Sequence, residues 1–532
     1  MMEETRQSEA AGDSSRTVRN LRSASLAAAL GLVGMGFGVS LRFSAPAPLV
    51  DLTRPLPPHD APKGVNSNLT DLAKFGWQEF VALSWPSVDP QATGHRGTPD
   101  TNKSFLDVTA ANPLLTVWQT YRHKNEQFPG DKKATDPSFD SKAPRYGYLN
   151  KITVPPGTRF DLWNNLDESS QIGLCKMYAN VKSGAPDDAY RVLYEAKMNR
   201  AAYDYGNRKT SVGALTDPTN GFAALATRTG NTSANLPQYG SICKSADGDK
   251  IVMLPCGSTI PGGGEGAIET KAAWRRLTSA EAASGRYYTA NVLYYASPRP
   301  GTYVAQNATY GLVSLHIIHK TLSFPAFVFT SFEQVDQYPG PRNTLAFVNT
   351  KTPISPGTPT QVARDYAIPR EIEAVNADVL AQLKTTGSVW KYYKMVGVQA
   401  VPFTPTITPS PNPPANPTFA PPANLPPSVP RDEAENVFFL SNIMVETNQT
   451  LQNFYGGAPG GLPVPGTNVY AGGKPNQMGG CQGCHGFQGQ QQGGDMSILI
   501  AKAPYNTLTP EAYNNSHAQA VESALRRRVL PH

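Results

Sequence analysis

Glycine and proline divide most of this chain into short apolar runs, and this limits the folds open to it. The 532 residues include 46 glycines and 48 prolines, which is well above average usage. Runs rich in branched and aromatic residues alternate with glycine and proline turns, a pattern typical of strands. These runs are 114–122, 146–154, 191–198, 287–296, 310–321 and 325–335. We therefore expect short strands joined by long loops, and not a helical bundle.

Two helices are predicted at the edges of this strand-rich region. Asn68 or Ser67 can cap the first, and Pro86 ends it. Its apolar stripe is Leu69, Leu72, Ala73, Trp77, Phe80 and Val81. The second covers Arg370–Lys384, where apolar residues again form one stripe after Pro369. Helices together with many short runs predict an α+β domain dominated by antiparallel sheet.

Shifts in composition divide the chain into five segments. The first is a signal peptide or membrane anchor, the second a proline-rich tether, and the third the large α+β domain. A proline-rich linker or strap follows, and then a C-terminal strand with a haem-binding segment. Their ranges are 1–45, 46–67, 68–400, 401–430 and 431–532.

The N-terminus has the pattern of an export signal. Arg16, Arg19 and Arg22 precede an uncharged, largely apolar run over 24–41, and small residues follow it. The run is also long enough to cross a bilayer once without being cleaved. A buried cytosolic helix suits it less, because the run contains four glycines. We expect a periplasmic or otherwise exported protein, with cleavage and inner-membrane anchoring both open.

The charge distribution argues against nucleic acid as a partner. The formal net charge is +6, and the basic residues are scattered except at Arg526–Arg528. A nucleic-acid-binding surface needs a concentrated basic patch, so we exclude that class.

Two of the five cysteines are expected to form a disulfide. Cys243 and Cys256 bracket a stretch whose Asp-Gly pair predicts a hairpin turn. In an oxidising compartment such a pair forms a disulfide, and two buried thiols are the alternative. Cys175 is interpreted as a small core residue.

The densest cluster of thiol and imidazole groups is Cys481-Gln-Gly-Cys484-His485. Two thiols at this spacing can add to the two vinyl groups of one haem, and the adjacent histidine can bind its iron. A zinc site needs two further ligands, and none lies nearby. A redox dithiol needs a helix N-terminus after a strand, whereas glycines flank this motif. Chance occurrence is the remaining alternative.

These residues resemble the attachment site of c-type cytochromes. The resemblance implies one covalent haem c, held by Cys481 and Cys484, with His485 as the proximal iron ligand. Together with the pattern above, it predicts an α+β fold with an antiparallel-sheet-rich large domain and a C-terminal haem-binding loop and helix. The segment departs from a small cytochrome domain because a glycine- and proline-rich loop precedes the motif. Only 47 residues follow His485.

The sixth iron ligand stays open. Met496 is the single methionine after the motif, and His316 of the large domain is the alternative. Met478 and His517 are weaker candidates. His316 and His319 would point to opposite faces of a strand, so at most one of them could meet a haem.

A broader resemblance covers residues 68–500. The stretches "GWQEFVALSWP", "GLVSLHIIHKT", "SFEQVD" and "GCQGCHG" resemble large exported bacterial proteins with a C-terminal cytochrome c motif. That likeness implies that the haem loop belongs to the large domain and is not an independent module.

Three functions are compatible with these features. The first is a monohaem cytochrome that passes electrons to a redox partner protein in the periplasm. The second is a haem oxidoreductase, peroxidase- or oxygenase-like, whose large domain binds a small organic substrate. The third is a binding or assembly protein with structural haem. No convergent acid–base cluster is evident: Asp167 and Glu168 suit a cap or turn, and Glu269 and Lys271 suit a surface pair.

Overall fold

The computed structural model describes residues 47–127, 138–147, 149, 152, 154, 157, 159–168, 175–178, 190–210, 213–214, 243, 253–258, 264–299, 302–325, 327–337, 345–349, 359–362, 368–400, 495 and 497. The chain divides into two units, Met1–Ala47 and Pro48–His532. All of the elements named below belong to the second unit.

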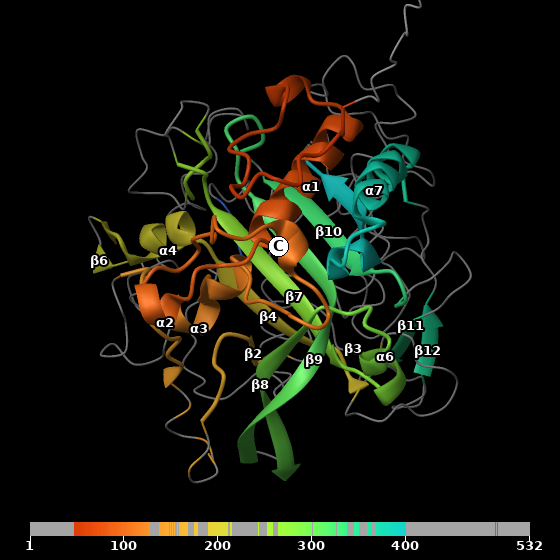
Figure 1. Ribbon diagram of the computed structural model, residues 1–532. Coiled ribbons are helices and arrows are strands. Elements are labelled where there is room, and N and C mark those ends of the chain that lie inside the picture. The colour runs from red at the N-terminus through yellow and green to blue at the C-terminus, as the bar shows by residue number, and fades with distance from the viewer. Residues whose placement is uncertain are drawn as a thin grey trace, which may run out of the picture. The chain divides into compact units, whose positions relative to one another are not determined.

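Eight of the described strands form one mixed sheet (Figure 1). The main path runs β1-β4-β7-β9-β10-β13, and β8 pairs with both β9 and β2. The β2–β8 pair is parallel, whereas all the other pairs in this sheet are antiparallel. The strands are β1 (Arg122–His123), β2 (Asn165–Leu166), β4 (Leu193–Met198), β7 (Ile268–Arg276), β8 (Thr289–Arg299), β9 (Thr302–His319), β10 (Val328–Gln334) and β13 (Tyr393–Gln399).

Strand β9 organises this sheet because it is long enough to serve two sets of partners. Its first half pairs with β8, and its second half runs between β7 and β10. The sequence predicted this strand from one apolar run over 310–321. The structure extends it to Thr302, where polar residues continue the pairing with β8.

Smaller described elements surround the main sheet. A three-stranded sheet has the order β12-β11-β3, and β5 pairs with β6. Their bounds are β3 (Cys175–Tyr178), β5 (Lys209–Thr210), β6 (Gly213–Ala214), β11 (Leu345–Asn349) and β12 (Pro359–Val362). The short helices are α2 (Pro90–Thr93), α3 (Lys124–Gln127), α4 (Arg200–Asn207) and α6 (Ser279–Ala283).

Helix α1 (Leu69–Leu83) begins at the cap that the sequence predicts. The Asn68 side chain accepts a hydrogen bond from the Asp71 N–H, and the Asp71 carboxylate accepts one from the Asn68 N–H. This reciprocal pair satisfies two backbone donors at the start of the helix. The helix is buried nearly all round, and not only along its apolar stripe.

Helix α1 lies unusually close to one face of the sheet because Gly76 has no side chain. A Cβ at Gly76 would come within 2.5 Å of Thr330 on β10 and 2.7 Å of Met395 on β13. Helix α7 (Arg370–Leu383) packs beside α1. The Trp77 indole donates to the Asn376 amide oxygen over 2.9 Å, and the same oxygen accepts from the Met395 N–H. One buried amide therefore joins both helices to the sheet.

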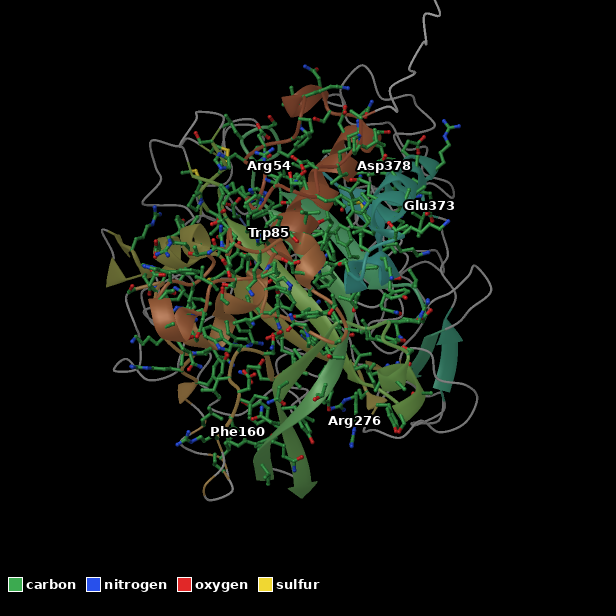
Figure 2. The ribbon with its side chains drawn as sticks, viewed as in Figure 1. Arg54, Trp85, Phe160, Arg276, Glu373 and Asp378 are labelled. Carbon is green, nitrogen blue, oxygen red and sulfur yellow. A yellow bond between two sulfur atoms is a disulfide. The ribbon has the colours of Figure 1, made fainter. Side chains whose placement is uncertain are left out.

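The far side of α1 is covered by the segment that precedes it. Val50, Leu52 and Ala61 belong to the main hydrophobic core, although composition indicated a tether over 46–67. The Gln78 amide donates to the Asp51 carbonyl over 3.0 Å. The Leu49 N–H donates to Asp378 on α7, whose outer face also carries Glu373 (Figure 2). These contacts explain why α1 is buried on both sides.

The α+β class predicted from the sequence is confirmed. Strands β4, β8, β9 and β10 and helices α1 and α7 all lie where the runs and periodicities placed them. The strand predicted over 114–122 is wrong, because Trp118–Thr120 forms a 3-10 helix and only Arg122 enters a strand. There the Gln119 side chain accepts from the Thr116 N–H and donates to Asn164, and these bonds stabilise the turn.

Several predicted segments lie outside the described residues. They are the apolar run over 24–41, the proline-rich stretch over 401–430, the strand that follows it, and the C-terminal helix predicted together with the haem-binding loop. Within the described part of the chain, no helix has the length and apolar character needed to cross a membrane.

Candidate functional site

The motif itself lies outside the described residues. Cys481, Cys484 and His485 are not among them, and neither is Met496; the same holds for Met478 and His517. Two residues that bracket Met496 in the sequence, Asp495 and Ser497, are described, and both are buried. Asp495 and Ser497 are the described residues of the segment after the motif.

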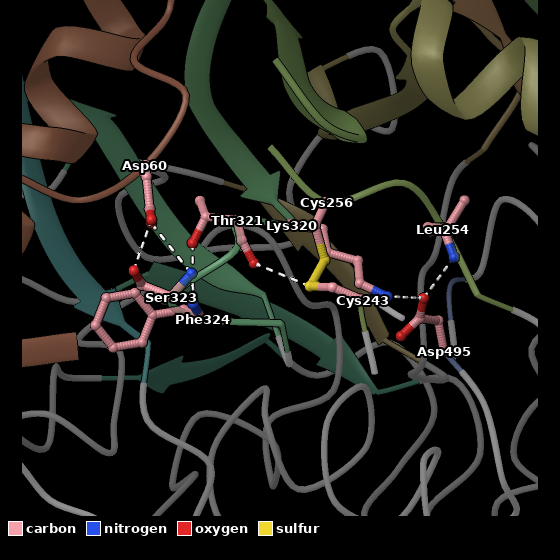
Figure 3. The surroundings of a disulfide bond; sticks show 9 residues. All are labelled: Asp60, Cys243, Leu254, Cys256, Lys320, Thr321, Ser323, Phe324 and Asp495. Atoms are coloured by element: carbon pink, nitrogen blue, oxygen red, sulfur yellow. Dashed lines mark hydrogen bonds and ion pairs between the residues drawn. A yellow bond between two sulfur atoms is a disulfide. The ribbon is translucent and has the colours of Figure 1, made fainter. Parts of the chain in front are cut away.

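Asp495 is anchored to the end of strand β9. Its Oδ2 atom accepts a hydrogen bond from the Leu254 N–H over 2.6 Å and forms an ion pair with the Lys320 ammonium (Figure 3). The side chains of Lys320 and Asp495 are fully buried. Burial lowers the pKa of Lys320, and the neighbouring carboxylate opposes that shift. A buried pair of this kind depends on both partners, because either charge alone would be left without compensation.

The backbone around Lys320 is fixed by two neighbouring segments. The Lys320 N–H donates to the Ala267 carbonyl, and the Lys320 carbonyl accepts from the Gly257 N–H, each over 2.9 Å. The Ala267 N–H in turn donates to the Pro255 carbonyl over 2.9 Å. These bonds continue the pairing beyond the end of β9 and hold Leu254 beside Lys320.

The disulfide expected from the sequence is present at this position. Cys243 and Cys256 are bonded, and their Cα atoms are 5.7 Å apart. The Cys243 sulfur lies 3.8 Å from the Thr321 carbonyl (Figure 3). The disulfide therefore ties the segment that carries Leu254 to Cys243, which lies near the residues just after β9.

Ser497 makes the second contact of the C-terminal segment. Its hydroxyl donates to the Glu269 Oε2 atom on β7 over 2.6 Å. Burial raises the pKa of Glu269 to about 7, the bond from Ser497 opposes the shift, and the Asp495 charge adds to it. The other carboxyl oxygen of Glu269 is buried without a hydrogen-bond partner among the described residues. Glu269 can therefore hold or release a proton near neutral pH.

The surface pair expected at Glu269 and Lys271 is wrong. Glu269 is 4% exposed and Lys271 is 8% exposed. The Lys271 ammonium lies over the Tyr194 ring, 5.6 Å from its centre. Spacing alone indicated that the two side chains share a face, but it could not show that this face is covered.

His316 and His319 lie on opposite faces of the sheet, as their spacing predicts. His316 pairs with Lys271 and Ser331, whereas His319 pairs with Ile268 and Val328. Directly paired residues share a face, so His316 lies on the same face as Glu269. His319 lies on the face covered by α1.

The neighbours of His316 hold its imidazole ring in one orientation. Its Nδ1 atom and the Ser331 hydroxyl are 2.6 Å apart, and its ring stacks on Phe329 at 5.9 Å. Histidines that bind metals through one nitrogen commonly engage the other in such an outer bond. If His316 binds iron, it therefore does so through Nε2.

His319 is committed to a buried structural pair. Its Nδ1 atom lies 2.6 Å from Glu79 on α1, and its Nε2–H donates to the Glu265 carbonyl over 2.5 Å. Burial alone would lower the pKa of His319, but the bonds to Glu79 and Glu265 outweigh it and raise the pKa. For Glu79 burial has the opposite effect, and it raises the pKa of this carboxyl group. Both ring nitrogens of His319 are therefore engaged by protein groups, and His319 is excluded as an iron ligand.

Asp167 and Glu168 are buried, and the cap or turn expected for them is wrong. Glu168 forms an ion pair with Lys124, and Asp167 accepts from the Asn125 amide. The His123 Nε2 atom lies 3.4 Å from Asp167, and its Nδ1 atom accepts from the Asn125 N–H over 3.1 Å. Nδ1 therefore acts as an acceptor and Nε2 faces Asp167, so both ring nitrogens are directed at protein groups.

Sequence reasoning missed the buried ion pair of Lys320 and Asp495. The sequence gives one indication for Lys320, because it directly follows an apolar strand. A lysine that is buried at such a position needs an ion-pair partner. For Asp495 there is no such indication, since its partners are 175 and 241 residues away along the chain. Within the described ranges, no group of three or more histidine, cysteine, aspartate or glutamate residues could hold a metal ion.

Comparisons of the chain with protein-family models, with curated proteins and with solved structures found no match. The chemistry of the residues themselves is what points to a function.

Proposed function

We propose that this protein is an exported c-type haem protein that transfers electrons in the periplasm. Cys481 and Cys484 would hold one haem through thioether bonds, and His485 would be its proximal ligand. The observation that carries the proposal is the C-x-x-C-H spacing in a chain whose N-terminus has the pattern of an export signal, because covalent haem attachment uses these residues in this order.

The large domain supports this proposal through its contacts with the segment after the motif. Asp495 lies ten residues beyond His485, and a chain spans at most about 3.6 Å per residue. The buried contacts of Asp495 and Ser497 therefore support a position for the motif close to the large domain. A haem segment this small needs other protein to exclude water from it.

The residues present suit a haem in their donor chemistry. Thiols for attachment and an imidazole for iron all occur within five positions. His316 lies on the same face of the sheet as Glu269. Its Nδ1 atom is bonded to the Ser331 hydroxyl, and Glu269 accepts a hydrogen bond from Ser497. Bound haem c supplies one-electron oxidation and reduction. The sixth ligand would be Met496 or His316.

Covalent attachment tests the proposal directly. The full chain is expressed with its own leader in a bacterium that matures c-type cytochromes, and haem-dependent peroxidase staining follows denaturing electrophoresis. We expect staining of the wild type and its loss in the double variant C481A/C484A. C175A is the matched control, because it removes a thiol outside the motif and should keep the stain. An unstained wild type contradicts the proposal.

Glu269 favours one second candidate function. A buried carboxyl with a pKa near 7 is suited to proton transfer, and it contacts the segment after the motif. The second candidate is therefore a haem oxidoreductase whose large domain binds a small organic substrate. Structural haem in a binding or assembly protein is the third.

Carbon monoxide distinguishes these candidates. A reduced protein whose absorption spectrum does not change with the gas has both axial positions of the iron filled by protein ligands, which favours electron transfer. A spectrum that shifts on adding the gas indicates an open position and favours the oxidoreductase. Haem that neither changes redox state nor binds the gas supports a structural role.

A further inference from the structure

A buried cation lies directly after strand β9, and its described ion-pair partner comes from a distant part of the chain. Lys320 is fully buried, and its ammonium pairs with Asp495, 175 residues further on. The same Asp495 oxygen accepts from the Leu254 N–H over 2.6 Å. One carboxylate oxygen therefore accepts from two neighbouring buried donors, which would otherwise need another acceptor.

The backbone donor in this arrangement is held in place by the disulfide segment. Leu254 lies two residues before Cys256, which is bonded to Cys243. Cys243 lies against the Thr321 carbonyl, next to Lys320. The disulfide thus braces the segment that carries Leu254, which backbone hydrogen bonds hold beside Lys320 (Figure 3).

We infer that Lys320 and the disulfide-held Leu254 form a docking site for the segment that follows the C-x-x-C-H motif, with Asp495 as its anchor. Ser497 then adds the bond to Glu269 that fixes the direction of the segment. Lys320 is a positioning residue, because it holds the segment and not a substrate. The inference concerns protein contacts and holds whether or not haem is attached.

Charge is what makes this docking specific. A buried carboxylate without its cation is strongly unfavourable, whereas two neutral groups of similar size at the same place cost little. K320M should therefore release the segment, since it leaves Asp495 buried and alone. K320M/D495N should restore docking, because the asparagine oxygen still accepts from the Leu254 N–H and no charge remains.

Hydrogen–deuterium exchange on the full-length protein tests this inference. We measure the peptides that contain Leu254 and residues 495–497, with a β10 peptide as the reference for global folding. K320M should accelerate exchange in the first two peptides by roughly 100-fold or more and leave β10 unchanged. K320M/D495N should return exchange to within about tenfold of the wild type.

Two further variants make the test decisive. K103M, which removes an exposed lysine, is the matched control and should leave every peptide unchanged. C243S/C256S should accelerate exchange at Leu254 and at 495–497 by about tenfold, since it frees the disulfide segment. Unchanged exchange at 495–497 in K320M overturns the inference. So does equal acceleration in K320M and K320M/D495N, because charge would then not be the cause.

Covalent haem is measured on the same samples by mass. Protein without haem that still shows the expected exchange pattern removes the proposed function and keeps the docking site. Protein with haem in which K320M has no effect does the reverse.

Discussion

Buried charges are the main feature of this molecule at the scale of single residues. Glu126 is fully buried and accepts two hydrogen bonds from Arg96 and one from Arg122, at 2.8 to 3.0 Å. Burial by itself raises the pKa of Glu126, but the two guanidinium groups outweigh it and hold the pKa at about 2. The carboxylate therefore stays ionised in the folded protein far below its usual range.

Replacing Glu126 should destabilise the protein strongly. E126Q removes the anion that the buried Arg96 and Arg122 guanidinium groups share, so we expect a loss of about 3–5 kcal/mol in the free energy of unfolding at pH 7. Because the folded pKa is depressed, the wild type has this stabilisation above about pH 4.5 and loses it as the pH falls towards 2. Urea unfolding at several pH values measures it. E373Q on the exposed face of α7 is the control, and equal effects of the two variants would contradict the prediction.

Glu269 should give the opposite pH dependence. Its pKa is raised from 4.5 to about 7 in the folded protein, so its stabilising contribution is present below about pH 4.5 and is lost as the pH rises through 7. The full change is on the order of 3 kcal/mol. E269Q cannot ionise, and its stability relative to the wild type should rise between pH 5 and pH 8. Urea unfolding at both pH values measures this, and a constant difference would rule it out.

These residue-scale features could not be predicted from the sequence. Glu269 and Lys271 have the spacing of an exposed strand pair, and Asp167 and Glu168 have the composition of a turn. Burial of each depends on partners that are distant in the chain, such as Ser497 for Glu269 and Lys124 for Glu168. Cys243 and Cys256 were predictable because they are close in sequence and flank a turn signal.

At the scale of elements, the close contact of α1 with the sheet depends on Gly76. Alanine has the higher helix propensity by about 1 kcal/mol. At this position, however, its methyl group would meet Thr330 at 2.5 Å. Because Thr330 is a short side chain on a central strand, we expect G76A to destabilise the protein by about 1–3 kcal/mol in net terms.

Thermal unfolding of G76A and G387A tests this contact. A Cβ at Gly387 would meet Thr109 only at 3.7 Å, so G387A should have a small effect. A melting temperature of G76A at or above that of the wild type would contradict the close packing of α1 on β10.

Element positions were largely predictable where periodicity is local. Helix α1 starts directly after its cap, Asn68, because the cap and the apolar stripe are adjacent in the sequence. Strands β9 and β10 follow from branched and aromatic runs. The 3-10 helix at Trp118–Thr120 was missed because side-chain bonds of Gln119 to distant residues stabilise it. The packing of residues 48–61 on α1 was missed because a proline-rich composition does not show which surface such a segment packs against.

At the scale of the whole molecule, the sixth iron ligand connects the motif with the large domain. If the haem is six-coordinate with Met496, M496A should become sensitive to carbon monoxide while H316A keeps the wild-type spectrum. If His316 is the ligand, the effects of the two variants are reversed. H517A serves as the control and should change neither spectrum. Insensitivity of the spectrum to both M496A and H316A would exclude both residues.

The central claim is that one haem is attached at residues 481–484. Mass spectrometry of peptides from the protein, matured in a cytochrome c-producing bacterium and then denatured, tests it most directly. We predict that the peptide containing Cys481 and Cys484 carries the added mass of one haem, and that no other cysteine peptide does. Recovery of that peptide at its unmodified mass would contradict the account.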